Sequence, residues 1–227
     1  EYLRAFLATR TAWSRLGALF LVSGAFGVFR KDAVVDVGGF STSTLGEDLE
    51  LVLRMHHHLK QQRRPYRIVF IPDPVVWTEA PERLRTLRRQ RDRWHRGLLE
   101  CMWRYRKMVF RPRYGLLGCV ALPYLWLFEV GGPVVETVGY LTVIGATIAG
   151  ELNAPFMILF VLVAMAYGVA LSISALLMDE MHLRRGQSAG DILRLIGYTV
   201  LENFGYRQLL AIWRFLVTVQ ILRGKQG

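Results

Sequence analysis

The chain has 227 residues, of which 52% are hydrophobic, and its formal net charge is +11. Its mean hydropathy is positive, at +0.26. An ordinary soluble globular domain does not combine an apolar composition with such a charge, so these values argue against one and indicate contact with a membrane. A nucleic-acid-binding surface is an alternative explanation of the charge.

Residues 1–81 predict part of an α/β domain. Residues 19–30, LFLVSGAFGVFR, are too short to cross a membrane and contain a serine and two glycines. We interpret them as a buried strand that leads into a short helix and the turn DVGGF. Residues 66–73, YRIVFIPD, predict a second strand, and Pro81 is expected to open the next helix.

Residues 41–60, STSTLGEDLELVLRMHHHLK, predict a helix between these strands, capped by the serine or threonine at position 43 or 44. Asp48 lies on the same side as the apolar residues Leu51, Val52 and Met55, so its side chain is expected to point inward. Glu47 and Glu50 are interpreted as solvated residues that stabilise the helix dipole. The adjacent histidines 56–58 diverge around the helix, which favours a solvated helix end over a metal site.

Residues 82–113 predict basic helices at a membrane interface. Residues 83–113 contain twelve Arg or Lys and only two acidic residues, directly before a long apolar segment. In a helix, Gln90, Arg93, Trp94 and Gly97 share one face, called here the QxxRW face, with Gly97 leaving room for a bulky group to approach the backbone. The other arginines lie on the remaining sides: Arg88, Arg89, Arg91 and Arg96.

Residues 114–182 predict transmembrane helices. Residues 154–178 form one apolar segment of spanning length, whereas residues 114–150 fit one long kinked crossing or two short ones. A single crossing is favoured because it places Arg184 and Arg185 on the same side as the basic run. Glu129 and Glu136 are expected to face protein or a polar pathway, or to mark helix ends at the interface. Residues 183–227 predict amphipathic membrane-associated helices broken near Gly205.

Four stretches of this sequence carry a resemblance to a known family. They are SGAFGVFRKDAVVDVGGF (23–40), GEDLEL (46–51), PDPVVWTEAPE (72–82) and QRDRW (90–94). In this order and spacing they resemble the second half of a membrane-embedded family 2 glycosyltransferase of the processive kind, similar to cellulose, hyaluronan and poly-N-acetylglucosamine synthases. The resemblance implies that residues 1–81 are the C-terminal part of a GT-A-like catalytic domain, followed by an α-helical transmembrane region.

The resemblance also implies an inverting sugar transfer from a nucleotide-sugar donor to a saccharide or glycolipid acceptor. Asp48 would be the general base, and Arg93 would hold the diphosphate leaving group. The implied substrate-binding residues are Gln90, Arg93, Trp94, Glu47, Ser23 and Gly24. The lipid bilayer is the implied partner, with no nucleic acid, and the implied location is the plasma (inner) membrane with the catalytic side facing the cytoplasm.

The sequence departs from the family pattern in lacking a D-x-D motif. Mg²⁺ or Mn²⁺ is therefore implied for the full-length enzyme, with ligands outside this chain. The chain begins at Glu1 and lacks the expected nucleotide-binding half, so we expect it to be a fragment that is inactive alone. Three alternatives stay open: a non-catalytic basic membrane scaffold that binds anionic lipid, a membrane tether for nucleic acid, and a transferase that adds a single sugar to a lipid carrier.

Overall fold

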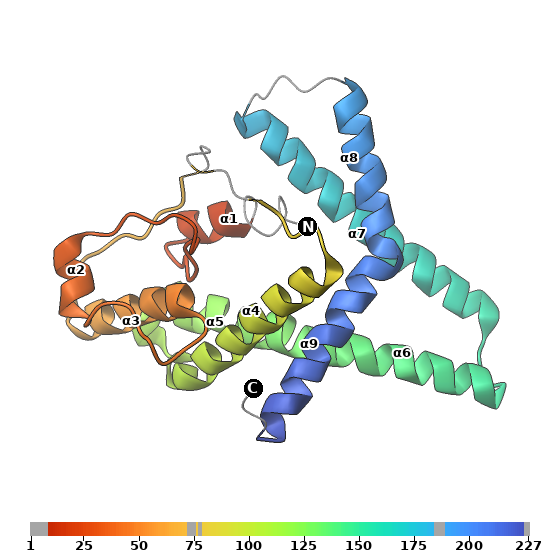
Figure 1. Cartoon of the computed structure of the whole chain (residues 1–227), viewed down its shortest axis with the longest axis horizontal. Helices are drawn as coiled ribbons and strands as arrows, with labels where there is room; N and C mark the ends of the chain where they lie inside the picture. Colours follow the sequence, from red (N-terminus) through yellow and green to blue (C-terminus); the bar gives the residue numbers. More distant parts are fainter. Residues whose placement is uncertain (1–8, 72–75, 77–78, 184–188, 225–227) are drawn as a thin grey trace. The chain divides into compact units, whose positions relative to one another are not determined.

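The computed structural model describes residues 9–71, 76, 79–183 and 189–224, and the regular elements in these ranges are helices (Figure 1). The α-helices are α1 (Thr9–Arg15), α2 (Lys31–Asp36), α3 (Glu47–Gln61), α4 (Leu84–Arg104), α5 (Leu122–Tyr124), α6 (Gly131–Ala149), α7 (Ala154–Leu183), α8 (Ala189–Leu201) and α9 (Arg207–Leu222). The 3₁₀ turns are η2 (Arg106–Met108) and η3 (Pro112–Tyr114), and the π-helical turns are η4 (Leu117–Ala121), η5 (Leu125–Val130) and η6 (Glu202–Tyr206).

The chain divides into two compact units. The unit that holds the quoted motifs, called here the motif unit, comprises Arg10–Gly132 and Trp213–Gly227. The other, called the apolar unit, comprises Glu1–Thr9 and Pro133–Ile212.

The core of the motif unit forms where α3 packs against α4. Leu51 and Val52 are fully buried on α3 and Met55 is buried beside them, which confirms the predicted inward side of this helix. The largest buried cluster joins α3 and α4 to the helical turns that follow: Ala18, Phe20, Leu49, Leu53, Cys101, Met102, Tyr105, Met108, Tyr114, Leu117, Ala121, Leu122, Leu125 and Val130.

Two glycines set the closest approach between α3 and α4. Gly46 is the N-cap residue of α3, and Gly97 is a buried residue inside α4. A Cβ atom built on Gly97 would lie 2.6 Å from the Gly46 nitrogen, and one built on Gly46 would lie 3.1 Å from the Gly97 Cα. The two backbones are therefore in direct contact, and the room beside Gly97 is filled by the start of α3.

The two predicted strands are not confirmed, because no described residue of 19–30 or 66–71 pairs with a neighbouring strand. Backbone groups of both segments bond to side chains instead. The Leu19 carbonyl contacts the His56 ring at 2.8 Å, and the Phe70 N–H donates to Ser14 Oγ at 2.8 Å. A strand needs a ladder of backbone hydrogen bonds, which side-chain partners do not supply. The last two residues of the second predicted strand, Pro72 and Asp73, lie outside the described residues.

The predicted helix starts need correction. The N-cap residue of α3 is Gly46 rather than residue 43 or 44, and the Thr44 hydroxyl accepts from the Gly46 N–H at 3.2 Å while it donates to Glu100. Helix α4 begins at Leu84, three residues after Pro81, with Arg83 as its N-cap residue. The short helix α2 and the following turn agree with the prediction, since Gly38 and Gly39 have positive φ angles of 86° and 77°.

Among the described residues, one continuous helix, Leu117–Ala149, is long and apolar enough to cross a membrane, and Ala154–Ala170 is a shorter apolar stretch. The π-helical turns on either side of α5 interrupt the regular α-helical hydrogen-bond pattern of this helix. The tail breaks where predicted, because Gly205 has a φ angle of 89° between α8 and α9. Arg184 and Arg185 lie outside the described residues.

We expect Gly97→Ala to destabilise the motif unit by about 1 to 3 kcal/mol, because the added methyl group overlaps the Gly46 backbone, which is part of a helix end and has little room to move. Thermal and chemical unfolding in detergent, followed by circular dichroism, measures the loss.

Gly132→Ala is the matched control, since a Cβ there meets nothing within 4 Å. It should be neutral or slightly stabilising, by up to about 1 kcal/mol, because alanine favours helix. Equal stability of the two variants would contradict the contact.

Candidate functional site

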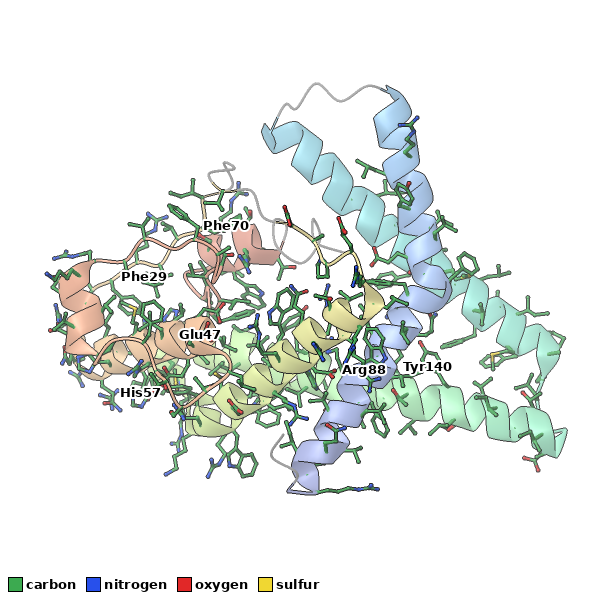
Figure 2. All side chains as sticks on the ribbon, in the orientation of Figure 1. Phe29, Glu47, His57, Phe70, Arg88 and Tyr140 are labelled. Atoms are coloured by element: carbon green, nitrogen blue, oxygen red, sulfur yellow. The ribbon has the colours of Figure 1, made fainter. Side chains whose placement is uncertain are left out.

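Asp48 lies in the first turn of α3, half-buried, beside the exposed Glu47 that Figure 2 labels. In the described part of the chain, the hydrogen bond to its carboxylate comes from the neighbouring Leu49 N–H, 2.7 Å from Oδ1. Oδ2 faces the Ser23–Gly24 turn, where a Cβ on Gly24 would lie only 3.1 Å away. The glycine leaves the space that this carboxylate occupies.

Burial dominates the electrostatics of Asp48. Desolvation raises the pKa of its carboxyl group, the Leu49 N–H opposes that rise, and the charge of Arg10 opposes it weakly. Arg10, on α1, is only 7% exposed, and burial lowers its pKa to about 10 while the charge of Asp48 raises it. A desolvated carboxylate with a raised pKa is a stronger proton acceptor than an exposed one.

The three polar and aromatic residues of the QxxRW face lie along α4, before Gly97. Arg93 is exposed, Trp94 is 38% exposed, and Gln90 is partly buried. Trp94 precedes the Gly46 contact by three residues, or about 5 Å along the helix axis. Gly97, at the C-terminal end of this face, therefore meets the start of α3, whereas the sequence alone placed no element next to it.

One arginine assigned to another side of α4 contacts this face. The guanidinium carbon of Arg91 lies 5.0 Å from the centre of the Trp94 ring. Such a cation–π contact fixes the orientation of the indole and covers part of it. Arg91 is therefore not a neutral neighbour of the site.

Glu100 fastens the loop before α3 to α4. One oxygen of its carboxylate accepts from the Thr44 hydroxyl at 2.8 Å and from the Leu45 N–H at 3.0 Å. One residue on, the buried Cys101 thiol lies 3.6 Å from the Gly46 carbonyl, and burial raises its pKa to about 12. A thiol that stays protonated serves packing here rather than nucleophilic chemistry.

Glu50 is not the solvated first-turn residue that the sequence suggested. It is 2% exposed, and its carboxylate lies 2.9 Å from the Arg54 guanidinium. Tyr105 donates to it at 2.7 Å, and Arg104 approaches at 3.5 Å. Burial without such partners would be strongly unfavourable, so Glu50 holds α3, α4 and, through Arg54, the carbonyl groups of the turn 37–39 together.

One of the three histidines differs from the prediction, because His56 is only 1% exposed, whereas His57 and His58 are partly exposed. Its Nε2 lies 2.8 Å from the Leu19 carbonyl, which only accepts, so the ring donates there. Its Nδ1 then accepts from the Tyr66 hydroxyl at 2.6 Å. His56 thus fixes the segment that leads to Ser23 and Gly24. Its pKa is lowered to about 4 by burial.

A second buried histidine, His95, lies on the side of α4 that points away from the QxxRW face. His95 Nε2 is 2.9 Å from the Thr218 hydroxyl, and its Nδ1 accepts from Arg214 at 3.4 Å. Arg214 also pairs with Glu129, at 2.8 Å. These contacts attach α9 to α4 within the motif unit and give Glu129 the protein partner that its position in an apolar segment predicts.

Metal ligands do not gather in the part of the chain that the structure describes, where no three His, Cys, Asp or Glu side chains form a group that could hold an ion. Glu47 and Asp48 are adjacent on a helix, with one exposed and the other facing Gly24. These residues do not fit a divalent metal centre by themselves, so the chemistry derived below uses side chains of this chain alone.

Comparison with known proteins assigns the family. A model of the glycosyl transferase family group 2 matches residues 3–173, three quarters of the chain. The chain belongs to this family. No solved structure matches it.

Two curated relatives show where the similarity lies. The poly-beta-1,6-N-acetyl-D-glucosamine synthase of Staphylococcus aureus strain COL is 35% identical over 118 residues, which cover 50% of this chain and 27% of the relative. A putative cellulose synthase 2 of Komagataeibacter xylinus is 37% identical over 79 residues, 35% of this chain and 5% of the relative. The chain thus matches about a quarter of the first relative's length.

The structure brings some of the predicted site residues together and adds supporting residues that the sequence did not indicate. Asp48, Ser23 and Gly24 lie together, and the QxxRW face adjoins the start of the same helix. Arg10 was missed, although Arg10 and Ser14, four residues apart, mark a buried polar side of α1. The i, i+4 spacing of Glu50 and Arg54 in the sequence indicates an ion pair. No sequence pattern indicates that Glu100 bonds to residues 44 and 45.

The stability of the motif unit should fall as the pH is lowered from about 6.5 to about 4. In this window the unfolded state protonates residue 56, whereas the folded state, with a His56 pKa of about 4, does not, so acidification favours unfolding. The contribution is on the order of 3 kcal/mol. Urea unfolding in detergent at a series of pH values measures it.

His56→Gln should make this pH dependence shallower, with the remainder contributed by His95, whose pKa burial lowers to about 3. His58→Gln is the matched control, because His58 is partly exposed and its ring, among the described residues, bonds to Gln62 at the end of the same helix. It should keep the full dependence. An unchanged slope in His56→Gln would show that the buried ring does not titrate as described.

Proposed function

We propose that the protein is an inverting glycosyltransferase that moves a sugar from a nucleotide-sugar to a growing polysaccharide or glycolipid acceptor at a membrane. The observation that carries the proposal is the backbone contact of Gly46 with Gly97, which brings the Asp48 end of α3 beside the QxxRW face of α4. Family membership supports the reaction class. The names of the matched relatives, both synthases of polysaccharides, support a polymer product.

The proposed reaction is a single displacement. The Asp48 carboxylate takes the proton of an acceptor hydroxyl, and the oxygen of that hydroxyl forms a bond to the anomeric carbon of the donor sugar. The bond from this carbon to the diphosphate oxygen breaks on the opposite face, and its electron pair leaves with the nucleoside diphosphate. Attack from the opposite face inverts the configuration.

The remaining residues of the site bind the two substrates. Arg93 offers an exposed planar guanidinium that forms paired hydrogen bonds with phosphate oxygens and stays charged. Trp94, held by Arg91, offers an aromatic surface of the kind on which sugar rings pack. Gln90, on the same face of α4, offers an amide group for hydrogen bonds to the substrate. Gly24 and Ser23 shape the wall opposite Asp48.

The same proposal includes a GT-A-like catalytic fold for residues 1–81 and a location in the inner membrane with the catalytic side facing the cytoplasm. The long apolar helix Leu117–Ala149 supports a membrane location. The basic residues that precede it support an orientation toward the cytoplasm. Mg²⁺ or Mn²⁺, if the protein uses it, would neutralise charge on the diphosphate and would need ligands beyond the described residues.

A non-catalytic membrane scaffold explains the basic charge equally well, but it does not explain why the Asp48 carboxylate is half-buried. A scaffold that binds anionic lipid needs exposed cations, not a half-buried carboxylate facing a glycine turn. An assay of the full-length protein for glycosidic products, with a panel of nucleotide-sugars, distinguishes the glycosyltransferase from the scaffold. Lack of any glycosidic product across the panel would favour the scaffold.

Asp48→Asn should reduce turnover by at least about a hundredfold, because general-base catalysis typically contributes 10² to 10⁴. Donor binding should stay nearly intact. The acid limb of the wild-type rate profile should lie above the pH expected for an ordinary aspartate, since burial raises the pKa of Asp48. Steady-state kinetics of the protein at its natural length, over a range of pH, measure both effects.

The matched control is Asp36→Asn, which makes the same chemical change at a surface residue that pairs with Arg64. Its turnover should stay within about twofold of the wild type, because a surface ion pair contributes little. Turnover of Asp48→Asn at the level of this control would rule Asp48 out as the base.

Arg93→Ala should weaken the binding of a nucleoside diphosphate by about tenfold or more, the loss expected when a charge-assisted hydrogen bond to phosphate is removed. Isothermal titration calorimetry with UDP and GDP measures the affinity without requiring turnover.

Arg89→Ala is the matched control, because Arg89 is exposed on α4 but lies off the QxxRW face. It should change the affinity by less than about threefold. Equal losses in the two variants would mean that the overall charge of α4 binds the ligand, and the scaffold explanation would gain.

A further inference from the structure

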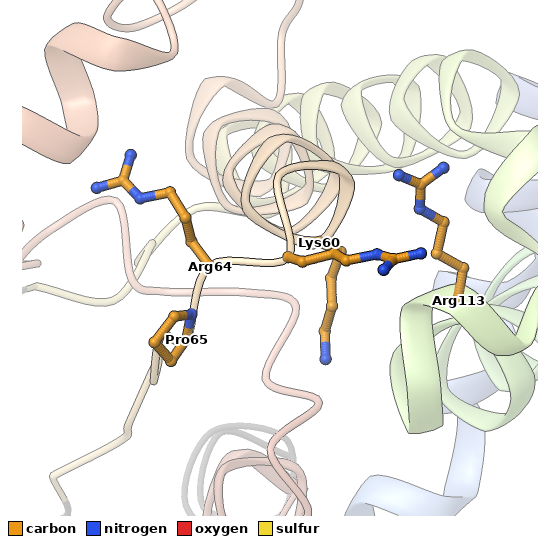
Figure 3. A pocket seen from close by; sticks show the side chains of 5 residues that line it. Lys60, Arg64, Pro65 and Arg113 are labelled. Atoms are coloured by element: carbon orange, nitrogen blue, oxygen red, sulfur yellow. The ribbon is translucent and has the colours of Figure 1, made fainter.

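A basic hollow lies at the C-terminal end of α3, the end of that helix away from Asp48. It has a volume of about 510 Å³ and is lined by Lys60, Arg63, Arg64, Pro65 and Arg113. Figure 3 shows Lys60 and Arg64 around the end of α3, with Arg113 arriving from the separate turn η3. Two segments about fifty residues apart in the sequence thus bring their cations to one place.

The positive charge of the basic hollow is not balanced by the protein. Among the described residues, the one carboxylate paired with its lining is Asp36, whose oxygen lies 3.0 Å from Arg64. Lys60 lies over the Tyr66 ring at 5.6 Å, and Arg113 donates to the Gln61 carbonyl at 2.9 Å, so these contacts are made to neutral groups. Four cationic side chains line this open hollow, and an anion bound there would lower the repulsion between their charges.

The backbone at Arg63 is held in an unusual conformation. Arg63 follows the C-cap residue Gln62 and has a φ angle of 55°, in the left-handed region that glycine normally supplies at this position. The helix end is closed by the Arg64 N–H, which donates to the Leu59 carbonyl at 3.0 Å. An arginine here is less favourable than a glycine for the backbone, and such residues often mark functional positions.

A purely structural explanation covers only part of the cluster. Cations near a helix C-terminus stabilise the helix dipole, and this accounts for Lys60 and for the bond of Arg113 to the Gln61 carbonyl. It does not explain an arginine at the left-handed position 63, where glycine would close the helix with less strain.

The position of the basic hollow indicates the source of the anion. Arg113 lies four residues before Leu117, where the helix long enough to cross a membrane begins. Trp103, in the last turn of α4, and Phe110, in the segment between α4 and this helix, are 64% and 73% exposed, respectively. Exposed aromatic and basic residues next to an apolar helix are typical of the headgroup level of a bilayer.

We propose that the basic hollow binds a phosphate group, with the headgroup of an anionic phospholipid as its source. This site is separate from the proposed donor site at the other end of α3, and its occupation needs no sugar transfer. A phosphate carries several acceptor oxygens, and the guanidinium groups of Arg63 and Arg113 with the Lys60 ammonium supply donors of the matching charge.

The test measures the binding of short-chain phosphatidylglycerol and, separately, of inorganic phosphate to the detergent-purified protein by calorimetry. The double variant Lys60→Gln, Arg63→Gln should weaken binding by about tenfold or more, because two charge-assisted contacts are lost. The matched control is Lys107→Gln, Arg111→Gln, which removes the same two residue types from exposed positions outside the hollow, in the segment that carries Arg113. It should change the affinity by less than about threefold.

A second variant separates binding from folding. Arg63→Gly removes one cation but suits the positive φ angle, so it should leave the melting temperature unchanged or raise it while weakening binding severalfold. Unchanged affinity in Arg63→Gly, or equal losses in the two double variants, would overturn the proposal. If the variants weaken the binding of inorganic phosphate and the protein does not bind phosphatidylglycerol, the site stands and its ligand is a free phosphate. Failure of the sugar-transfer proposal leaves all of these outcomes unaffected, since none of them measures transfer.

Discussion

The candidate site depends on the contact between the backbones of Gly46 and Gly97. At this separation the Glu100 carboxylate reaches the loop before α3, and the Cys101 thiol reaches the Gly46 carbonyl. Any larger side chain at either glycine would push the start of α3 away from α4 and lengthen all of these bonds together. The glycine of the QxxRW face is therefore a packing residue that sets the distance between α4 and the start of α3, the helix that carries Asp48.

Two carboxylates two residues apart on α3 have opposite roles because their surroundings differ. Glu50 pairs with Arg54 and Arg104 and accepts from Tyr105, so its charge helps to join three segments. Asp48, among the described residues, is bonded by the N–H of its own successor and faces a glycine turn, and burial raises its pKa. A carboxylate that is desolvated but lightly bonded remains available to accept a proton, whereas one held by several donors does not.

The acidic residues in the apolar segments follow the same rule of compensation. Glu129 pairs with Arg214 inside the motif unit, and Glu136 pairs with Arg207 at 3.4 Å and accepts from Tyr140 inside the apolar unit. Both basic partners come from α9, a helix whose apolar sequence carries two arginines seven residues apart. That spacing puts them on one side of α9, so the helix serves as a source of counter-charges for two separate carboxylates.

Periodicity in the sequence predicted the burial of Leu51, Val52 and Met55 on α3, but not the burial of Glu50 and His56 on its other sides, nor which distant groups they meet. The inward side of α3 and the members of the QxxRW face depend only on the 3.6-residue repeat, and both were predictable. The burial of His56 and the clamp of Glu100 depend on partners 37 and 55 residues away, respectively, which no local pattern specifies. The unconfirmed strands arise in the same way, since a strand exists only when another segment supplies its ladder, and here side chains of His56 and Ser14 bond to backbone groups of the two extended segments. Composition and periodicity identify the chemistry-bearing residues of such a protein, while the close approaches that small residues permit decide which of them meet.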